Sequence, residues 1–458
     1  MKIEQIYTGC LAQGAYYIES NGEVAIIDPL REITPYTERL AQHNHTLKYI
    51  FETHFHADFV SGHVSLAAKT GAQIIYGPNA DTQFEAYNAQ DLEVFQVGDC
   101  TIQAIHTPGH TLESTCYLLK DAEGKSKALF SGDTLFIGDV GRPDLAQQGL
   151  TMTKEDLAGI LYDSLRQKVM KLDPSTIIYP AHGAGSACGK KMSSETSDTL
   201  GNQLEANYAL RADMTKDEFI AEVLDGLGDP PGYFSANVRL NQEGYEHVDT
   251  LLSQSNDSYL SPDQFEELAN QEHPLMLDVR TVEEFSRAHI PNSIFVGLSG
   301  PFAPWVGELI VDVQTSILLI TNSKEQYEEA RIRLSRVGFD NVLGTLEGGI
   351  DAWVAAGKEV ASLENISPEE FMGAYQGKNI LDVRSDSEFS ISAMPTAKHI
   401  ALNKLNLQMD QLSKEDTTYL YCGSGYRSVI SCSILKSRGY HNLINVQGGF
   451  GALSKLMK

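Results

Sequence analysis

The sequence lacks a long apolar run, an excess of basic residues and a closely spaced set of cysteines. No uncharged stretch approaches the roughly 18 apolar residues of a membrane helix, and no signal peptide is evident. Lys and Arg number 35 against 61 Asp and Glu, and the net charge of −26 repels nucleic acids and anionic membranes. Six scattered cysteines in 458 residues are typical of reduced thiols. We therefore expect a cytoplasmic protein that binds neither nucleic acid nor membrane.

The length and the order of the apolar segments predict several domains with mixed α/β structure. A chain of 458 residues is too long for one hydrophobic core, which favours two to four domains. Residues 15–19 and 23–28 read as strands joined by the turn at Asn21 and Gly22. Further strands are expected over 72–76, 101–107, 115–119, 128–130 and 176–179, with helices over 37–42 and 154–168. Two β-rich halves with interspersed helices predict an αββα sandwich for this part of the chain.

Residues that commonly bind metals gather where the apolar run 48–51 ends. They are His54, His56, Asp58 and His63, within ten positions. On an extended chain His54 and His56 project to the same side, so both could offer a nitrogen to one metal ion. A helix is expected from Ser61 to Lys69, with Ser61 as its N-cap. The pattern favours a metal site over a polar surface turn.

Three more predicted strands end in residues of the same kind. His110 follows a Pro-Gly turn, Asp133 follows an apolar strand, and His182 follows Pro180 and Ala181. A single His or Asp at a turn is usually structural. Four such strand ends together indicate that these loops converge on one site.

These motifs, Thr53-His54-x-His56-x-Asp58, Pro108-Gly109-His110-Thr111, Ser131-Gly132-Asp133 and Pro180-Ala181-His182, resemble the ordered motifs of the metallo-β-lactamase superfamily. The superfamily contains hydrolases with two zinc ions, such as glyoxalase II, and also iron enzymes. In the hydrolases a His that follows the motif Asp binds the second metal, but Phe59 stands there in this sequence. We therefore expect a single metal.

The persulfide dioxygenase branch of the superfamily uses mononuclear Fe(II). The resemblance implies His54, His110 and Asp133 as its ligands, a set that leaves positions open for substrate sulfur and dioxygen. His56, Asp58 and His182 would then orient ligands and hold waters. A single zinc ion with a hydrolytic water is the alternative that these ligand types leave open.

Two downstream residues are candidates for substrate contacts. Arg142, in the segment Gly141-Arg142-Pro143-Asp144, could bind a carboxylate of a thiol tripeptide, or it could form a structural ion pair. Cys188 stands near Lys190 and Lys191. Because cations lower the pKa of a thiol, Cys188 could accept sulfur near the iron, although a lone cysteine in a loop is more often incidental.

The C-terminal part of the chain contains an internal repeat. Leu277-Asp278-Val279-Arg280 recurs as Leu381-Asp382-Val383-Arg384, and each copy opens with Ser-Pro before an expected helix, at Ser261 and at Ser367. We therefore predict three domains: residues 1–255 with the metal site, and two α/β repeats over 256–362 and 363–458.

The second repeat carries a thiol in a glycine-containing loop before a helix expected near Ser428. The loop consists of Cys422, Gly423, Ser424, Gly425, Tyr426 and Arg427. Backbone N–H groups at a helix N-terminus favour a thiolate or an anionic persulfide, and Arg427 offers a fork for sulfite or thiosulfate. The loop resembles the active loop of rhodaneses, which implies sulfur transfer through Cys422.

The first repeat lacks this loop. Thr321 stands opposite Cys422 and Gln326 opposite Arg427 when the repeats are aligned. Sulfur transfer cannot occur there, so we interpret this rhodanese-like copy as a degenerate one that serves as a structural spacer or a docking surface.

The chain as a whole resembles fusions of a persulfide dioxygenase with rhodanese domains. The resemblance implies one Fe(II) per chain, with zinc as the alternative, and oxidation of a low-molecular-weight thiol persulfide by O₂ to sulfite in sulfide detoxification. Cys422 would transfer sulfane sulfur to or from sulfite and thiosulfate. The alternatives are a zinc thiolester hydrolase of the glyoxalase II type and a non-catalytic sulfur carrier. The thiol of the substrate, the direction of transfer and the oligomeric state, with a homo-oligomer possible, stay open.

Overall fold

The computed structural model describes residues 1–145, 152–253 and 258–457. The domain boundary expected between residues 255 and 256 lies outside these ranges. The chain forms two compact units, the first comprising Met1–Thr250 with Ser335–Gly338 and the second Leu251–Leu334 with Phe339–Lys458. No helix in the described ranges is both long and apolar enough to cross a bilayer.

The first unit is built on two sheets, each with six strands among the described residues. In spatial order, one sheet contains β1 (Lys2–Thr8), β2 (Gln13–Ser20), β3 (Glu23–Ile27), β4 (Thr46–Phe51), β5 (Gln73–Tyr76) and β6 (Tyr87–Asn88). The other contains β12 (Asp198–Thr199), β11 (Ile177–Pro180), β10 (Ser126–Gly132), β9 (Thr115–Lys120), β8 (Cys100–His106) and β7 (Val94–Val97). The expected strands are therefore confirmed, with shifts of one or two residues at some ends.

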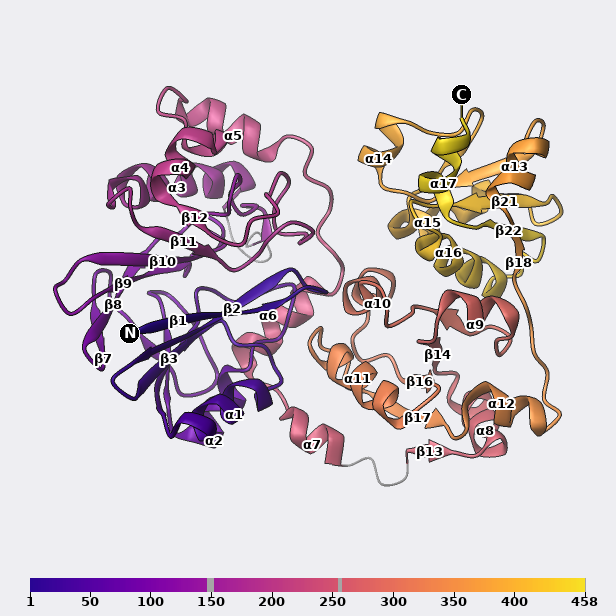
Figure 1. Ribbon diagram of the computed structural model, residues 1–458, viewed down its shortest axis with the longest axis horizontal. Helices are drawn as coiled ribbons and strands as arrows, with labels where there is room; N and C mark the ends of the chain where they lie inside the picture. Colours follow the sequence, from indigo (N-terminus) through magenta and orange to yellow (C-terminus); the bar gives the residue numbers. More distant parts are fainter. Residues whose placement is uncertain (146–151, 254–257, 458) are drawn as a thin grey trace. The chain divides into compact units, whose positions relative to one another are not determined.

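Helices cover the outer faces of both sheets (Figure 1). They are α1 (Thr34–His43), α2 (His63–Thr70), α3 (Lys154–Gln167), α4 (Leu200–Ala206), α5 (Lys216–Leu224) and α6 (Phe234–Glu243), and α7 (Val248–Ser253) follows at the end of the unit. Buried residues of both sheets, among them Ile18, Phe51 and Phe130, form the core between the sheets. The predicted αββα sandwich is confirmed.

The N-terminus of α2 differs from the expectation. The helix begins at His63 with Gly62 as its N-cap, and no side chain caps it. The Ser61 hydroxyl instead contacts the Pro29 carbonyl and the Glu52 carboxylate. The Ser61 hydroxyl therefore binds the buried Glu52 carboxylate and does not cap α2, contrary to the prediction from the sequence.

The second unit contains two copies of one α/β fold. The first copy has the sheet β13 (Tyr259–Leu260), β17 (Val342–Leu346), β16 (Ile317–Ile320), β14 (Leu275–Asp278), β15 (Ile294–Phe295), with helices α8 (Pro262–Glu272), α9 (Val282–Arg287), α10 (Phe302–Leu309), α11 (Lys324–Ser335) and α12 (Gly349–Ala355). The second has β18 (Glu364–Ile366), β22 (Leu443–Val446), β21 (Thr418–Tyr421), β19 (Asn379–Asp382), β20 (Lys398–His399), with α13 (Pro368–Ala374), α14 (Asp386–Ile391), α15 (Leu405–Gln408), α16 (Tyr426–Ser437) and α17 (Gly449–Leu456). Equivalent strands occupy equivalent places in the two parallel sheets.

The recurring sequence landmarks have the same structural role in both copies. Ser261 and Ser367 cap α8 and α13 through capping boxes, as predicted. Asp278 and Arg280 form a buried ion pair at 2.6 Å, and Asp382 and Arg384 form the same pair at 2.6 Å. Each pair fixes the turn between a central strand and the following helix.

Removal of one partner from this buried pair should destabilise the first repeat. Because Asp278→Ala leaves the Arg280 guanidinium buried and uncompensated, the free energy of local opening at β14 should fall by about 3 kcal/mol. Hydrogen exchange of β14 peptides measures that quantity. Lys324→Ala, which removes an exposed pair with Glu328, is the matched control and should change it by less than about 0.5 kcal/mol. An Asp278→Ala effect as small as the control would contradict the assignment.

Candidate metal centre and sulfur-transfer loop

Loops at one edge of the sandwich carry the candidate metal ligands. Strand β10 runs parallel to β11, and both β8 and β10 run antiparallel to β9, so β8, β10 and β11 end at the same edge. His110, Asp133 and His182 follow these three ends. His54 follows β4 of the other sheet.

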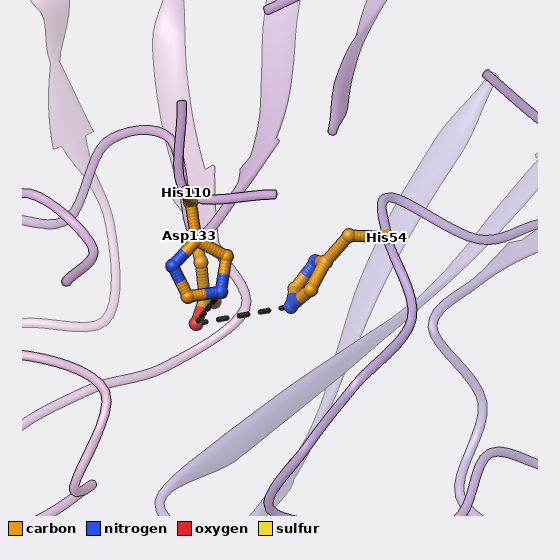
Figure 2. A group of neighbouring side chains, drawn as sticks. All are labelled: His54, His110 and Asp133. Carbon is orange, nitrogen blue, oxygen red and sulfur yellow. Dashed lines mark ion pairs between the residues drawn. The ribbon is translucent and has the colours of Figure 1, made fainter. Parts of the chain in front are cut away.

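The structure brings His54, His110 and Asp133 together (Figure 2). His110 Nε2 lies 3.5 Å and His54 Nε2 3.9 Å from Asp133 Oδ2. Figure 2 shows His54 approaching from one side and His110 with Asp133 from the other. All three side chains are buried, and one ligand atom from each lies within 4.8 Å of the others.

Hydrogen bonds to Nδ1 aim both imidazoles at Asp133. The Arg142 carbonyl can only accept, so His110 Nδ1–H donates to it at 2.7 Å, and Nε2 faces Asp133. The Thr53 hydroxyl donates to Asp28 Oδ2 at 2.9 Å and therefore accepts from His54 Nδ1–H, also at 2.9 Å. Such contacts orient metal-binding histidines.

Asp28 accepts the hydrogen bond that orients Thr53 and, through Thr53, His54. The sequence analysis did not identify Asp28 as part of the site. Its carboxylate accepts from the Thr53 amide at 2.8 Å as well as from the hydroxyl. Its backbone is left-handed (φ 50°), which is uncommon for a residue other than glycine. Asp28 follows β3 as Asp133 follows β10, so the strand-end pattern could have found it.

The three residues fit a divalent metal ion. Neither Asp133 oxygen has a hydrogen-bond partner in the described part of the chain, although both are buried. Burial, together with the neighbouring imidazoles of His56, His110 and His182, holds the pKa of His54 well below its usual range, so this histidine is neutral. A neutral imidazole and a buried carboxylate without a partner suit a cation. Donor types alone suit iron and zinc.

His56 does not share the site of His54 in the way expected from an extended chain. Its Nε2 lies 3.1 Å from Asp28 Oδ1 and 3.5 Å from Glu52 Oε2. Burial alone would lower the pKa of His56, but the carboxylates of Asp28 and Glu52 raise it well above its usual value. Residues 52–60 are not a strand, so alternation of side chains does not apply to them.

Asp58 and His182 lie beside the first three residues. His182 Nε2 is 3.5 Å from Asp58 Oδ2 and 3.6 Å from Asp133 Oδ1. Together with His56 they form a second buried group whose ligand atoms lie within 4.8 Å of one another. Phe59 is fully buried, and its ring packs against His56 at a centroid distance of 4.3 Å. Phe59 therefore offers no ligand atom to this second group, as expected from the sequence.

The Arg142 guanidinium forms the structural ion pair that the sequence left as an alternative to substrate binding. Its Nε and Nη2 each donate to the Asp144 carboxylate at 2.7 Å, and Nη2 also donates to the Gly228 carbonyl at 2.6 Å. The arginine side chain is 5% exposed. The residue contributes to the site through its backbone, because its carbonyl orients His110.

Cys188 is near the metal ligands, but the expected influence of the lysines is wrong. The thiol is buried and groups with Asp133 and His182. Burial first, and then the carboxylates of Asp58 and Asp133, raise its pKa well above the usual value. Lys190 Nζ donates to backbone carbonyls of Glu222 and Asp225, and so its charge does not serve the thiol. Sulfur acceptance by Cys188 stays a prediction.

The Cys422 loop in the second repeat surrounds the thiol with donors. Gly425 N–H donates to Cys422 Sγ at 3.1 Å, and Ser428 Oγ lies 3.6 Å from the same sulfur. Gly425 has φ 104°, a backbone conformation that side chains disfavour. Helix α16 begins at Tyr426 rather than near Ser428, so Tyr426 and Arg427 belong to its first turn.

Arg427 is held by a carboxylate that the sequence did not assign. Its two terminal nitrogens donate to Glu388 at 2.6 and 2.7 Å. These bonds lower the pKa of Glu388 to about 2. The fork expected for sulfite or thiosulfate is therefore occupied by an internal anion, and an oxyanion must share or displace it.

In the first repeat the equivalent loop has no thiol. Thr321 is buried and its hydroxyl lies 3.0 Å from that of Thr345, while Gln326 Oε1 accepts from the Asn322 amide at 2.8 Å. Glu284, the counterpart of Glu388, accepts from Asn322 Nδ2 at 2.8 Å. Neutral side chains thus replace the thiol and the guanidinium.

Comparison with known proteins agrees with this arrangement. The metallo-beta-lactamase superfamily model matches residues 8–182, and the rhodanese-like domain model matches residues 261–356 and 367–456. A hydroxyacylglutathione hydrolase from Tolumonas auensis is 36% identical over 171 residues, which are 36% of this chain and 60% of that protein. A probable zinc-dependent hydrolase of polyketide biosynthesis from Bacillus velezensis is 30% identical over 39% of this chain and 76% of its own length.

Among solved structures, a metallo-beta-lactamase from Staphylococcus aureus is 28% identical with a TM-score of 0.65. It covers 76% of this chain and 98% of its own, so the similarity extends beyond the first unit. The chain belongs to the metallo-β-lactamase superfamily through its first unit and carries tandem rhodanese-like domains in its second. Both kinds of domain indicate an enzyme, and the superfamily implies a divalent metal.

The Thr53 hydroxyl should matter for metal affinity. Thr53→Val keeps the shape of the side chain but removes the acceptor for His54 Nδ1–H, so affinity for Fe(II) or Zn²⁺ should fall about 10- to 100-fold. Chelator competition with metal analysis measures the effect. Thr53→Ser keeps the hydroxyl and should stay close to the unmodified protein. Equal affinities for Thr53→Val and Thr53→Ser would contradict the orienting role.

Proposed function

We propose that this protein is a persulfide dioxygenase with sulfurtransferase activity. It oxidises the outer sulfur of a low-molecular-weight thiol persulfide, such as that of glutathione or coenzyme A, to sulfite at one Fe(II) in the cytoplasm. The observation that carries the proposal is the convergence of two oriented imidazoles, His54 and His110, on the partnerless carboxylate of Asp133. Two histidines and one carboxylate are the ligand set of many non-haem iron oxygenases.

The residues in and around this ligand set have different proposed roles. His54, His110 and Asp133 would hold Fe(II), which when bound supplies the redox chemistry between persulfide and O₂. Thr53, through Asp28, and the Arg142 carbonyl keep the imidazoles aimed. The rings of Phe59 and Phe136 flank His182, at 6.4 and 6.2 Å, and form an apolar wall that limits water. Overall, persulfide, O₂ and water give thiol, sulfite and two protons.

Cys422 would carry out the second reaction. Its thiolate attacks the outer sulfur of R–S–SH, the bond between the two sulfurs breaks, and R–S⁻ leaves while Cys422 becomes a persulfide. Sulfite then takes that sulfur, giving thiosulfate and the free thiolate, and the reverse direction uses the same groups. The Gly425 N–H supports the anionic sulfur in each state.

A zinc thiolester hydrolase is the second candidate function. It is favoured by the similarity to hydroxyacylglutathione hydrolase and by the second group of ligand-type residues, His56, Asp58 and His182. Phe59 opposes it, because this ring packs on His56 in place of a further ligand. Two zinc ions per chain and turnover of S-lactoylglutathione would establish it.

The two proposed activities should separate cleanly. Protein purified anaerobically and loaded with iron should consume O₂ when given glutathione persulfide, as measured with an oxygen electrode. Cys422→Ser should keep this uptake and lose transfer of sulfur from thiosulfate to cyanide. Absence of O₂ uptake at full iron loading would refute the dioxygenase. Loss of uptake in Cys422→Ser would refute the division into two sites.

A further inference from the structure

The cysteine-free repeat lines a cavity at the Cys422 loop. The cavity has a volume of about 1020 Å³ and lies within the second unit. Residues 424–427 of the loop line it together with first-repeat residues that include Glu283, Ser286, Arg287 and Trp305. The sulfur-transfer site thus has one wall from each repeat.

Tyr426 joins the two walls. Its hydroxyl donates to the Gly297 carbonyl at 2.8 Å, and its ring meets Phe295 edge-on at 5.7 Å. Gly300 makes this possible, because a Cβ there would lie 2.5 Å from the Tyr426 ring. Arg333 donates to the carbonyls of Leu298 and Gly300 at 2.6 and 3.0 Å and so fixes the segment that receives the ring. A residue of the active loop is therefore seated in the first repeat.

The cavity is larger than an inorganic sulfur anion requires. Sites of roughly 300–1,000 Å³ bind organic molecules of metabolite or drug size, whereas sulfite or thiosulfate would occupy only a small part of such a volume. The loop's own Arg427 is paired with Glu388. The first repeat supplies the other charged side chains of the lining, Glu283 and Arg287.

The first-repeat wall offers one buried unsatisfied hydroxyl and two charged side chains. The Ser286 hydroxyl is buried without a hydrogen-bond partner in the described ranges, and its residue is 7% exposed. Arg287 is the positively charged residue of this wall, and it forms no ion pair with any residue that the structure describes. The Glu283 carboxylate lines the same wall. An arginine, a carboxylate and a hydroxyl match the carboxylate, ammonium and amide groups of an amino-acid-derived thiol.

We infer that the first repeat recognises the organic part of a carboxylate-bearing thiol persulfide while Cys422 takes its outer sulfur. The inference rests on the sulfur transfer proposed above and gives the degenerate repeat a role in substrate selection. Arg287 binds the carboxylate of the persulfide. Tyr426 holds the first-repeat wall beside the Cys422 loop through its contacts with Gly297 and Phe295. Transfer follows the balanced step already given: the Sγ–S bond forms, the S–S bond of the donor breaks, and the thiolate leaves.

The test uses the full chain without O₂, so that the iron site cannot consume the donor. Sulfite is the acceptor, thiosulfate is measured, and the rate with Cys422→Ser is subtracted as background. Donors are glutathione persulfide and the persulfide of 2-mercaptoethanol, which has no carboxylate. For Arg287→Glu the ratio of kcat/KM between these donors should fall roughly tenfold, through the KM for glutathione persulfide, because a charged hydrogen bond is lost.

Arg438→Glu is the matched control. Arg438 is exposed at the end of α16 and does not line the cavity, so this reversal of charge should leave the ratio unchanged. An unchanged ratio in Arg287→Glu, with transfer intact, would overturn the inference alone. If the unmodified chain forms no thiosulfate above background from either donor, sulfur transfer at Cys422 is refuted and the inference falls with it.

Discussion

The buried charge of Asp133 is the constraint on which the first unit depends. A carboxylate removed from water is costly unless a cation or hydrogen-bond donors compensate it, and neither oxygen of Asp133 has such a donor among the described residues. The groups nearest to it are imidazoles of His54, His110 and His182. Hydrogen bonds at Nδ1 hold the imidazoles of His54 and His110 so that Nε2 of each faces Asp133. The superfamily implies a divalent metal, and the strand ends of both sheets bring together the residues that would hold it.

The second unit shows how a repeated fold keeps its frame while its chemistry changes. The buried pairs Asp278–Arg280 and Asp382–Arg384 are alike in both copies. The copies differ in the loops after β16 and β21, where Cys422 accepts from the Gly425 N–H and Thr321 instead meets the Thr345 hydroxyl. Stability therefore resides in elements that both copies retain, so a copy can lose its thiol without losing its structure.

Much of the fold and of the metal group followed from local sequence. Period-two apolar runs predict strands, and ligand-type residues after several of these runs indicate one site, so His54, His110, Asp133 and His182 could be named in advance. The errors came from partners distant in the chain. The Ser61 hydroxyl donates to Glu52 and does not cap a helix. The Lys190 ammonium donates to the carbonyls of Glu222 and Asp225, not to the Cys188 thiol.

Other features could not be read from the chain at all. The ion pair of Arg427 with Glu388 spans 39 positions, and the cavity beside the Cys422 loop is lined by residues of both repeats. Sequence alignment of the repeats could show that the first has no thiol. It could not show that its side chains line the site of the second, because that depends on how the copies pack.

Two thiols of the chain, Cys188 and Cys422, have different neighbours. Cys188 is buried among carboxylates that raise its pKa, so without a bound cation it is a poor nucleophile. Cys422 receives an N–H donor at the start of α16, a setting that supports a negative sulfur through attack and release. A carrier of sulfane sulfur must be anionic when it attacks and again when it leaves. In the sulfur transfer proposed above, the Gly425 N–H and the Ser428 hydroxyl at the start of α16 would give the Cys422 sulfur that support.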